Sequence, residues 1–575
     1  MKKLILYILF IGGILIAGYY VFKYKHIIIY LVKSNTSTVF EEVVSEPVLG
    51  VFSFKPDAPS ELISTYKHYR LRLTKSVNWE KAANEIAKFP DTTPIMITVE
   101  TWGEGLYDSY RYNPMGGLIK GNYDDAIKAM CTQFIGNRDN VYIRFNPVME
   151  VPVKRYPWQR YGGIDYIEAY RHFSKLCKEF APAVKLVWGT AGYPGVMEYY
   201  PGDDVVDAAA IIAKSESEMV LKVYPKDYPI DYDVFRRLHR LRFIDKPIFI
   251  LGSQLTPKDS INTSLFTSLA NKVSNYNRTV YSTANFNRAH IATMKRAGTG
   301  LEIGLYDPQA LLNTEKSVTV EHLFVDFENL KNGSFERRFK EVISREHDII
   351  VTFEPFRNPN KEVDFEVLQN VSLGKYDREI KQLYRIIGNT ERLVYLRYAH
   401  EMEIPITRYP WQSQDPIVYI NSFRYFMNFP EKEMSNIKRV WGPAGDRGSL
   451  EWWPGNDVVD IVSIAIYGLP DKNITDPEKQ ESFETIFNRK VWRLRFLDKP
   501  IFITEFGVKG PEEYQTKWLE RAAEIITQNS QLIGVNYFNM SDTPKAWGEI
   551  KPPDWSISKK SFQSFTETLK REKKK

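Results

Sequence analysis

Cysteine is scarce in this chain of 575 residues, which contains only Cys131 and Cys177. Both lie in stretches with the spacing of amphipathic helices. Two cysteines cannot build the disulfide framework that stabilises many small secreted domains, nor a cysteine-rich metal cluster. We therefore expect two buried free thiols and no metal site.

A strong excess of one charge is also lacking. The net charge is +6, part of which comes from a lysine-rich tail at residues 570–575. No basic stripe interleaved with aromatic residues is visible, so we expect no nucleic-acid partner. Aromatic residues, by contrast, make up 14% of the chain. Many stand beside Pro and Gly, a context that suits carbohydrate stacking as well as core packing.

One uncharged apolar run, Leu4 to Phe22, follows Lys2 and Lys3 at the N-terminus. At about 19 residues it is long enough to cross a bilayer as a helix. A cleaved signal peptide would have a shorter apolar region and an Ala-x-Ala site, which is not seen. We expect residues 1–33 to be a single-pass membrane anchor with its juxtamembrane segment and residues 34–46 to be a linker. The remainder should lie outside the cytoplasm.

The chain repeats itself at a fixed offset. Arg144–Gln159 matches Arg397–Gln412, a shift of 397 − 144 = 253 residues, and the same shift carries Leu241–Ile250 onto Leu494–Ile503. A period of about 250 residues is the usual size of one (β/α)8 barrel. We therefore predict an α/β fold with two tandem (β/α)8 TIM barrels, at residues 47–312 and 318–569, followed by a basic tail at 570–575.

The second copy alternates short apolar runs with helical patterns such as 377–387 and 511–527, which is typical of a parallel sheet covered on both faces. The predicted strands are residues 322–327, 349–353, 393–398, 437–441, 458–466, 501–504 and 533–538.

Two acidic residues end apolar runs in this copy. Glu401 follows the run that begins at Leu393, and Glu505 follows Pro500–Thr504. Active-site groups of such barrels come from the C-terminal ends of strands. Retaining glycosidases need two carboxyl groups about 5 to 5.5 Å apart, one as acid/base and one as nucleophile. Taken singly, each glutamate could equally be a surface or helix-capping residue.

At these residues the sequence resembles glycoside hydrolase family 26, in motifs that occur in the family's order from Val318 to about Leu569. The similar segments are Arg397–Met402, Tyr409–Trp411, Trp453–Asp460 followed by Tyr467, and Lys499–Gly507.

The resemblance implies that Glu401 is the acid/base and Glu505 the nucleophile. It also implies that His400 forms hydrogen bonds within the site and that Tyr467 touches the nucleophile. Arg397 is assigned to the site on the same ground. Each of these three has a purely structural alternative as a packed side chain. Among the tryptophans we expect some to stack on sugars, above all Trp411 and Trp547, with Trp441 and Trp453 as further candidates. This chemistry requires no cofactor.

Some residues depart from the family pattern. Glu403 stands where the family usually has Asn, Ile404–Arg408 lengthens the step to the aromatic run, and Gly442–Gly448 differs from common members. These departures put the transfer of a substrate from any one member in doubt.

The first copy lacks the catalytic pair. The shift places Val148 at the position of Glu401 and Gly252 at that of Glu505. Valine offers no proton and glycine no nucleophile, so this copy should be inactive. Arg144 and Trp158 persist, which fits either a retained binding groove or a retained fold.

We therefore predict a membrane-anchored retaining endo-β-glycanase that hydrolyses an extracellular β-linked polysaccharide, of the β-mannan, mixed-linkage glucan or β-glucan type. One alternative is a non-hydrolytic, glycan-binding scaffold subunit of a polysaccharide synthesis or export complex. Another is a transglycosylase, which passes the sugar to a second glycan instead of water.

Overall fold

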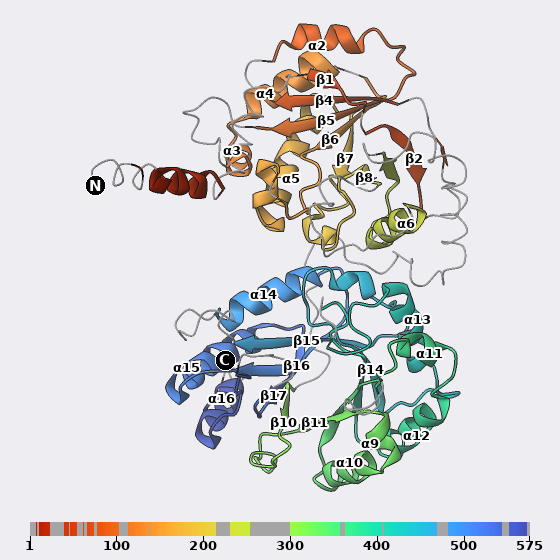
Figure 1. The fold of residues 1–575 in the computed structure, drawn as a ribbon, viewed down its shortest axis with the longest axis vertical. Coiled ribbons are helices and arrows are strands. Elements are labelled where there is room, and N and C mark those ends of the chain that lie inside the picture. Colours follow the sequence, from red (N-terminus) through yellow and green to blue (C-terminus); the bar gives the residue numbers. More distant parts are fainter. Residues whose placement is uncertain are drawn as a thin grey trace. The chain divides into compact units, whose positions relative to one another are not determined.

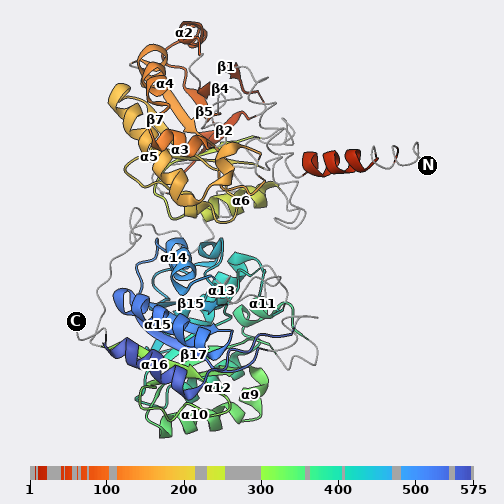
Figure 2. The same cartoon turned by 90° about the vertical axis from the view of Figure 1, so that its left-hand side faces the viewer.

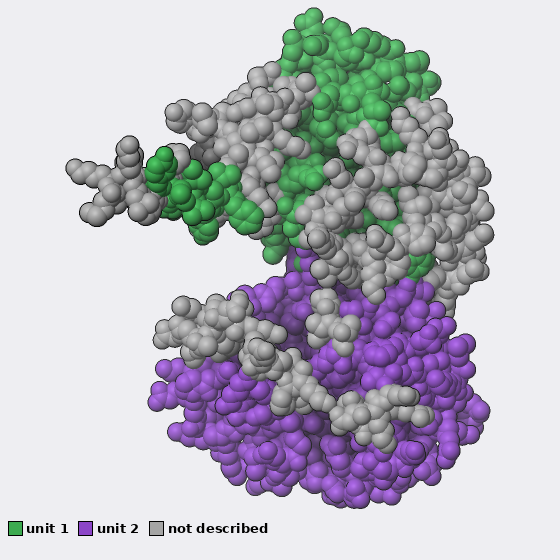
Figure 3. Space-filling model, in the orientation of Figure 1, with its two compact units in different colours: residues 1–276 green, residues 277–575 purple. Residues whose placement is uncertain are grey.

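The chain folds into two compact units, residues 1–276 and 277–575, in a computed structural model (Figure 3). Each unit is described by itself. The described residues are 7, 11–22, 40–44, 46–54, 61–62, 66–73, 77–102, 113–136, 138–153, 155–213, 230–252, 300–356, 363–404, 408–468, 481–542 and 551–571.

The second unit contains a closed barrel of eight parallel strands in sequence order (Figure 1). The strands are β10 (Glu302–Tyr306), β11 (Val320–Val325), β12 (Asp348–Phe353), β13 (Val394–Tyr398), β14 (Ile437–Trp441), β15 (Ile461–Gly468), β16 (Ile501–Val508) and β17 (Leu532–Phe538). The helices are α9 (Phe327–Lys331), α10 (Ser334–Ser344), α11 (Val367–Ser372), α12 (Asp377–Ile387), α13 (Pro416–Met427), α14 (Phe483–Arg493), α15 (Glu512–Gln528) and α16 (Lys559–Arg571). The (β/α)8 fold predicted for the second copy is confirmed.

Burial explains this arrangement. Every residue of β16 is buried, because one side of the strand faces the barrel interior and the other side faces helices. Helix α12 buries Ile380, Leu383 and Ile387, which recur at helical spacing and lie against the sheet. Apolar residues fill the N-terminal end of the barrel, which leaves polar side chains to the other end. This apolar layer consists of Val320, Ile350, Tyr395, Val440, Ile461 and Phe502.

The barrel begins earlier than we predicted. Strand β10 pairs in parallel with both β11 and β17, and it therefore closes the barrel. The expected boundary between residues 312 and 318 falls after this first strand. At the other end of the unit, α16 runs into the expected basic tail as far as Arg571.

The described part of the first unit is a half-barrel rather than the closed barrel that we predicted. Its nine strands follow the order β1-β4-β5-β6-β7-β8-β9-β2-β3, and β4 to β9 are parallel. Strand β2 runs antiparallel to β9 and occupies the edge at which a closing strand would bond. The 253-residue shift places the counterpart of β17 at residues 279–285, which lie outside the described residues.

The strands of this sheet are β1 (Phe40–Glu42), β2 (Val48–Phe52), β3 (Glu61–Leu62), β4 (Lys67–Leu73), β5 (Ile95–Thr101), β6 (Val141–Phe145), β7 (Lys185–Gly189), β8 (Ala208–Ile212) and β9 (Ile248–Leu251). The helices are α2 (Trp79–Ile86), α3 (Pro114–Ile119), α4 (Asp124–Ala129), α5 (Gly163–Phe180) and α6 (Ile230–Arg240), and Figure 2 shows α3, α4 and α5 along the sheet.

The predicted membrane anchor is described only in part, at Tyr7 and at residues 11–22, which are helical. Within the described residues, no helix combines the length and the apolar character needed to cross a membrane. Residues 11–22 rise by only about 18 Å, against roughly 30 Å of bilayer core. Their large apolar side chains are exposed, for example Leu15 and Phe22.

Candidate active site

Glu505 is held by two side chains at the C-terminal end of the second unit's barrel. The Arg397 guanidinium donates from Nη2 to Glu505 Oε1, and the Tyr467 hydroxyl donates to Oε2 at 2.9 Å. Burial raises the pKa of Glu505, but the positive charge of Arg397, the nearby His322 and the two hydrogen bonds outweigh this effect. The net pKa lies below the ordinary value, so Glu505 is a carboxylate near neutral pH.

Arg397 is fixed in place by two threonines. Its Nε donates to Thr352 Oγ1 at 2.9 Å and its Nη1 to Thr504 Oγ1 at 2.8 Å, and the side chain is only 1% exposed. A buried guanidinium in which each of the three nitrogens donates a hydrogen bond holds its carboxylate partner in one geometry. Arg397 therefore positions the Glu505 carboxylate.

Glu401 lies on a sharp turn directly after β13. Ala399 and Glu401 both have positive φ angles, of 44° and 54°, which non-glycine residues rarely adopt. The turn is held by the Glu401 amide, which donates to the Gly442 carbonyl at 2.8 Å. Only glycine fits at position 442, because a Cβ there would lie 2.5 Å from Arg397 Cδ. Strained backbone of this kind is often found at functional sites.

The two glutamates differ in protonation. Burial and then the negative charge of Glu505 raise the pKa of Glu401 to about 8. Glu401 is half-buried, so its carboxyl can be reached from the barrel mouth. At neutral pH the site thus holds one carboxylic acid and one carboxylate.

His400 Nε2 lies 4.0 Å from Glu505 Oε1, which is beyond hydrogen-bonding distance. Burial, Arg397 and Arg408 hold the pKa of His400 well below its ordinary value, so the ring is neutral. Its backbone carbonyl accepts a hydrogen bond from Trp411 Nε1 at 2.8 Å.

A second buried polar chain supports the site and was missed in the sequence. His322 Nε2 lies 2.7 Å from Thr352 Oγ1, and its Nδ1 lies 3.3 Å from Asn536 Nδ2. Asn536 in turn donates to the Thr504 carbonyl at 3.0 Å. Polar residues within otherwise apolar strands, at β11 and β17, were the signal that could have identified them.

The predicted stacking role of three tryptophans is not supported by their positions. Trp411, Trp441 and Trp453 are each 0% exposed, so none offers a free ring face to a sugar. Trp411 stacks on Tyr409, with ring centroids 4.5 Å apart, and Trp441 packs edge-on against Trp453 at 5.1 Å. Trp547 lies outside the described residues.

Other aromatic side chains line the mouth and are half-buried. They come from the ends of β10, β11, β15 and β17 and from the loop after β13. They are Tyr306, Phe324, Tyr409, Tyr467 and Phe538. Tyr306 lies between Phe538, at 4.7 Å between ring centroids, and Phe324, at 5.1 Å. These rings, rather than the buried tryptophans, offer apolar faces next to the glutamates.

Glu403 has a structural role. Its Oε1 accepts hydrogen bonds from the amides of Gly445 and Asp446, at 2.9 and 3.1 Å, and from Ser449 Oγ at 2.7 Å. In the first unit, Glu150 Oε1 likewise accepts from the Ala191 amide at 2.8 Å. Glu403 therefore anchors the loop after β14.

In the first unit, residues of that unit itself occupy the region that corresponds to the site of Glu401 and Glu505. Val148 keeps the positive φ angle of Glu401, at 54°, but joins an apolar cluster with Phe249 and Leu251. The counterpart of Arg397, Arg144, donates from Nη1 to Glu46 Oε2 at 2.6 Å. Pro47, the next residue, accepts a hydrogen bond from the Gly252 amide at 2.8 Å. Glu46 thus takes the place that Glu505 has in the second unit, as counter-ion of the buried arginine.

Trp158, which we expected to mark either a retained groove or a retained fold, is 0% exposed. Its Nε1 donates to the Pro147 carbonyl at 2.7 Å, as Trp411 does to His400. It therefore belongs to the retained fold.

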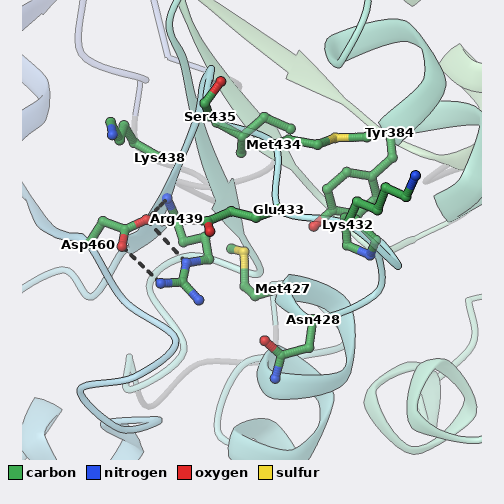
Figure 4. Close-up of a pocket in the computed structure, with 12 residues that line it drawn as sticks. Tyr384, Met427, Asn428, Lys432, Glu433, Met434, Ser435, Lys438, Arg439 and Asp460 are labelled. Carbon is green, nitrogen blue, oxygen red and sulfur yellow. Dashed lines mark hydrogen bonds and ion pairs between the residues drawn. The ribbon is translucent and has the colours of Figure 1, made fainter.

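Figure 4 shows a pocket of about 570 Å³ that is lined by residues such as Tyr384, Met434 and Lys438. It lies at the N-terminal end of β14, where Arg439 Nη2 pairs with Asp460 Oδ1 at 2.9 Å. Barrel enzymes carry their chemistry at the C-terminal ends of the strands. This pocket is therefore separate from the site of Glu401 and Glu505.

Comparison with known proteins gives partial matches, and no family model matches the chain. Over 157 residues it is 32% identical to the β-1,3-xylanase TXYA of a Vibrio species, covering 26% of this chain and 30% of that protein. Over 257 residues it is 24% identical to endoglucanase H of Acetivibrio thermocellus, covering 42% of this chain and 26% of that protein.

Among solved structures, GH26C from Muricauda sp. has 14% identity and a TM-score of 0.36, covering 47% of this chain and 85% of that structure. The matched part spans less than a third of the length of the two sequence relatives above. Both of those relatives are glycoside hydrolases.

Proposed function

We propose that the second unit is a retaining β-glycanase in which Glu505 is the nucleophile and Glu401 the acid/base. The observation that carries this proposal is the opposite protonation of two carboxyl groups in one barrel mouth. Arg397 and Tyr467 stabilise the carboxylate of Glu505, while burial and that negative charge keep Glu401 protonated. A nucleophile must be ionised and a general acid must carry its proton.

The reaction proceeds in two steps. In the first, Glu401 gives its proton to the glycosidic oxygen while Glu505 attacks the anomeric carbon, so that the glycosidic bond breaks and a glycosyl ester forms on Glu505. In the second, Glu401 is a carboxylate and takes a proton from water, whose oxygen attacks the anomeric carbon and releases Glu505. Arg397 and Tyr467 then again donate hydrogen bonds to the free Glu505 carboxylate.

The substrate proposed is an extracellular β-linked polysaccharide that is cut within the chain, and the enzyme is assigned to glycoside hydrolase family 26. The activities for which the relatives are named, β-1,3-xylanase and endoglucanase, support a β-glycan. To the β-mannans and β-glucans expected from the sequence, they add β-1,3-xylan as a test substrate.

The two remaining parts of the proposal concern the N-terminus and the first unit. The apolar run Leu4 to Phe22 supports a single-pass membrane anchor with both units outside the cytoplasm, and the exposed apolar side chains of residues 11–22 agree with it. The first unit is proposed to be a non-catalytic spacer, because Glu46 and Val148 fill the place of its catalytic pair.

The test is hydrolysis by the full chain of β-1,3-xylan, β-mannan, mixed-linkage glucan and carboxymethylcellulose. We expect one of these to be cut and Glu401→Gln and Glu505→Gln each to abolish cleavage. Glu513→Gln is the matched control, because Glu513 is exposed in the first turn of α15 and should leave the rate unchanged.

Three outcomes would contradict the proposal. Cleavage that survives Glu505→Gln would show that Glu505 is not the nucleophile, provided that the variant unfolds at the same temperature as the unaltered chain. Binding of a polysaccharide without any cleavage would favour a scaffold subunit. Sugar transfer to an added oligosaccharide, measured by product length, would instead favour the transglycosylase.

A further inference from the structure

Glu354 points into the same barrel mouth and has no role in the two-step reaction. It follows β12 directly, and its amide continues the parallel ladder by donating to the Val325 carbonyl at 2.8 Å. Side chains alternate along a strand. Thr352 faces inward to Arg397, and Phe353 faces outward, 5.3 Å from Phe327 of α9. Glu354 therefore faces inward above Thr352.

Within the described part of the chain, the carboxyl of Glu354 has no partner. No described residue forms a hydrogen bond or ion pair with it, although the residue is half-buried. Burial, Asp326 and Glu505 raise the pKa of Glu354 to about 8, and the negative charge of Glu354 helps to raise the pKa of Tyr409. A polar group that is partly withdrawn from water without a partner carries a free-energy cost.

The first unit contains the same acid with its partners present. By strand register, Thr98 lies opposite Arg144 as Thr352 lies opposite Arg397, so Glu100 is the counterpart of Glu354. Glu100 pairs with Arg70 Nε at 3.1 Å and accepts from Trp102 Nε1 at 2.8 Å.

Both donors are missing from the second unit. Arg70 lies opposite Thr98 and Phe324 lies opposite Thr352, so Phe324 replaces the arginine. Two residues beyond the acid, Phe356 replaces Trp102. Phe356 packs 6.0 Å from Tyr409, just as Trp102 packs 6.0 Å from Tyr156. The second unit therefore keeps the aromatic packing but lacks counterparts of Arg70 and Trp102, the two residues that bind the carboxyl of Glu100.

We propose that Glu354 binds the hydroxyl groups of a sugar residue in the subsite on the β11–β12 side of the catalytic pair. A carboxyl group can engage two neighbouring hydroxyls at once, and a protonated one can also donate. The half-buried rings of Phe324 and Tyr409, at the same end of the barrel, offer apolar faces to a sugar. The inference rests on the proposed function in that the ligand is a glycan.

The test compares Glu354→Ala, Glu354→Gln and the matched control Glu100→Gln in the full chain, with the polysaccharide that the unaltered chain cuts. We expect Glu354→Ala to raise KM roughly tenfold, the loss of about one hydrogen bond, with a smaller change in kcat. Glu354→Gln should recover most of the affinity, because its amide still donates and accepts. Glu100→Gln should leave KM unchanged.

Thermal unfolding separates binding from a structural role. Removing a half-buried acid that has no partner should leave the unfolding temperature of Glu354→Ala equal to or above that of the unaltered chain. An unchanged KM, or a lost activity accompanied by a lower unfolding temperature, would overturn the inference while leaving the proposed function intact.

If no polysaccharide is cut, the proposed function fails, and retardation of the chain in native gels that contain the same four polysaccharides tests Glu354 alone. Retardation that weakens in Glu354→Ala but not in Glu100→Gln would support the inference. Equal retardation of both variants, or none by the unaltered chain, would overturn it.

Discussion

Removal of the Glu46 carboxylate should destabilise the first unit strongly. Arg144 is 1% exposed and Glu46 is 23% exposed, and their 2.6 Å contact is the charged partner that we find for this arginine. Breaking a buried ion pair from one side costs about 3–5 kcal/mol, because the remaining charge stays buried. The partial exposure of Glu46 argues for the lower end, about 3 kcal/mol, for Glu46→Ala.

The chain offers a specific reporter for this unit. Its two cysteines, Cys131 and Cys177, are both buried in the first unit. Labelling of these thiols in the reduced protein at increasing urea concentration therefore reports the unfolding of that unit alone. With an m-value of about 1–3 kcal/mol/M, a loss of 3 kcal/mol lowers the labelling midpoint by about 1 M or more.

A double variant separates the ion pair from other effects. Arg144→Met in the Glu46→Ala background removes the stranded charge and should restore most of the lost stability. The pKa of Glu46 is lowered, so its stabilisation is complete above the ordinary value of 4.5 and is lost as the pH falls through the folded value. A midpoint that moves by less than about 0.2 M at pH 7 in Glu46→Ala would refute the reasoning.

Two further predictions concern the second unit. In a profile of kcat/KM against pH, the rate should fall as the pH rises through about 8, where Glu401 loses its proton, and should fall again in acid, below the ordinary pKa range of a glutamate, where Glu505 gains one. Tyr467→Phe removes a hydrogen bond to the Glu505 carboxylate and should move the acid limb of the profile to higher pH. An acid limb that does not move would contradict the role of Tyr467. Gly442→Ala should displace Arg397 and lower the free energy of unfolding by about 1–3 kcal/mol, which urea unfolding can measure. Hydrolysis of the polysaccharide should fall as well, and a variant with normal activity would contradict this prediction.

Much of the second unit's fold could be predicted because its elements depend on local patterns. Helix α12 and strand β14 have the bounds expected from residues 377–387 and 437–441. Strand β10 was missed, since its five residues include a glycine and carry no alternating pattern. Its pairing with β17, more than 200 residues later, identifies it as the strand that closes the barrel.

The candidate site likewise has features that local sequence patterns predict and features that they do not. Arg397, Tyr467, Glu401 and Glu505 could be grouped from their positions at strand ends, and the structure brings them together, although their roles stay predictions. The prediction that tryptophans stack on sugars was not supported, because residue type alone does not show which ring face stays accessible to a ligand. Trp411 is fully buried, whereas Phe324 is only half-buried.

The contact of Glu46 with Arg144 could not have been predicted, since it joins residues 98 positions apart and its acid comes from a segment outside the repeat motifs. It nevertheless follows from one physical requirement. A guanidinium held beneath a barrel mouth needs a carboxylate, whether or not that carboxylate reacts. Glu505 meets this need from β16, whereas Gly252 cannot. The absence of a carboxylate at position 252 and the ion pair supplied by Glu46 therefore follow from the same electrostatic constraint. A carboxylate introduced at position 252 would compete with Glu46 for Arg144.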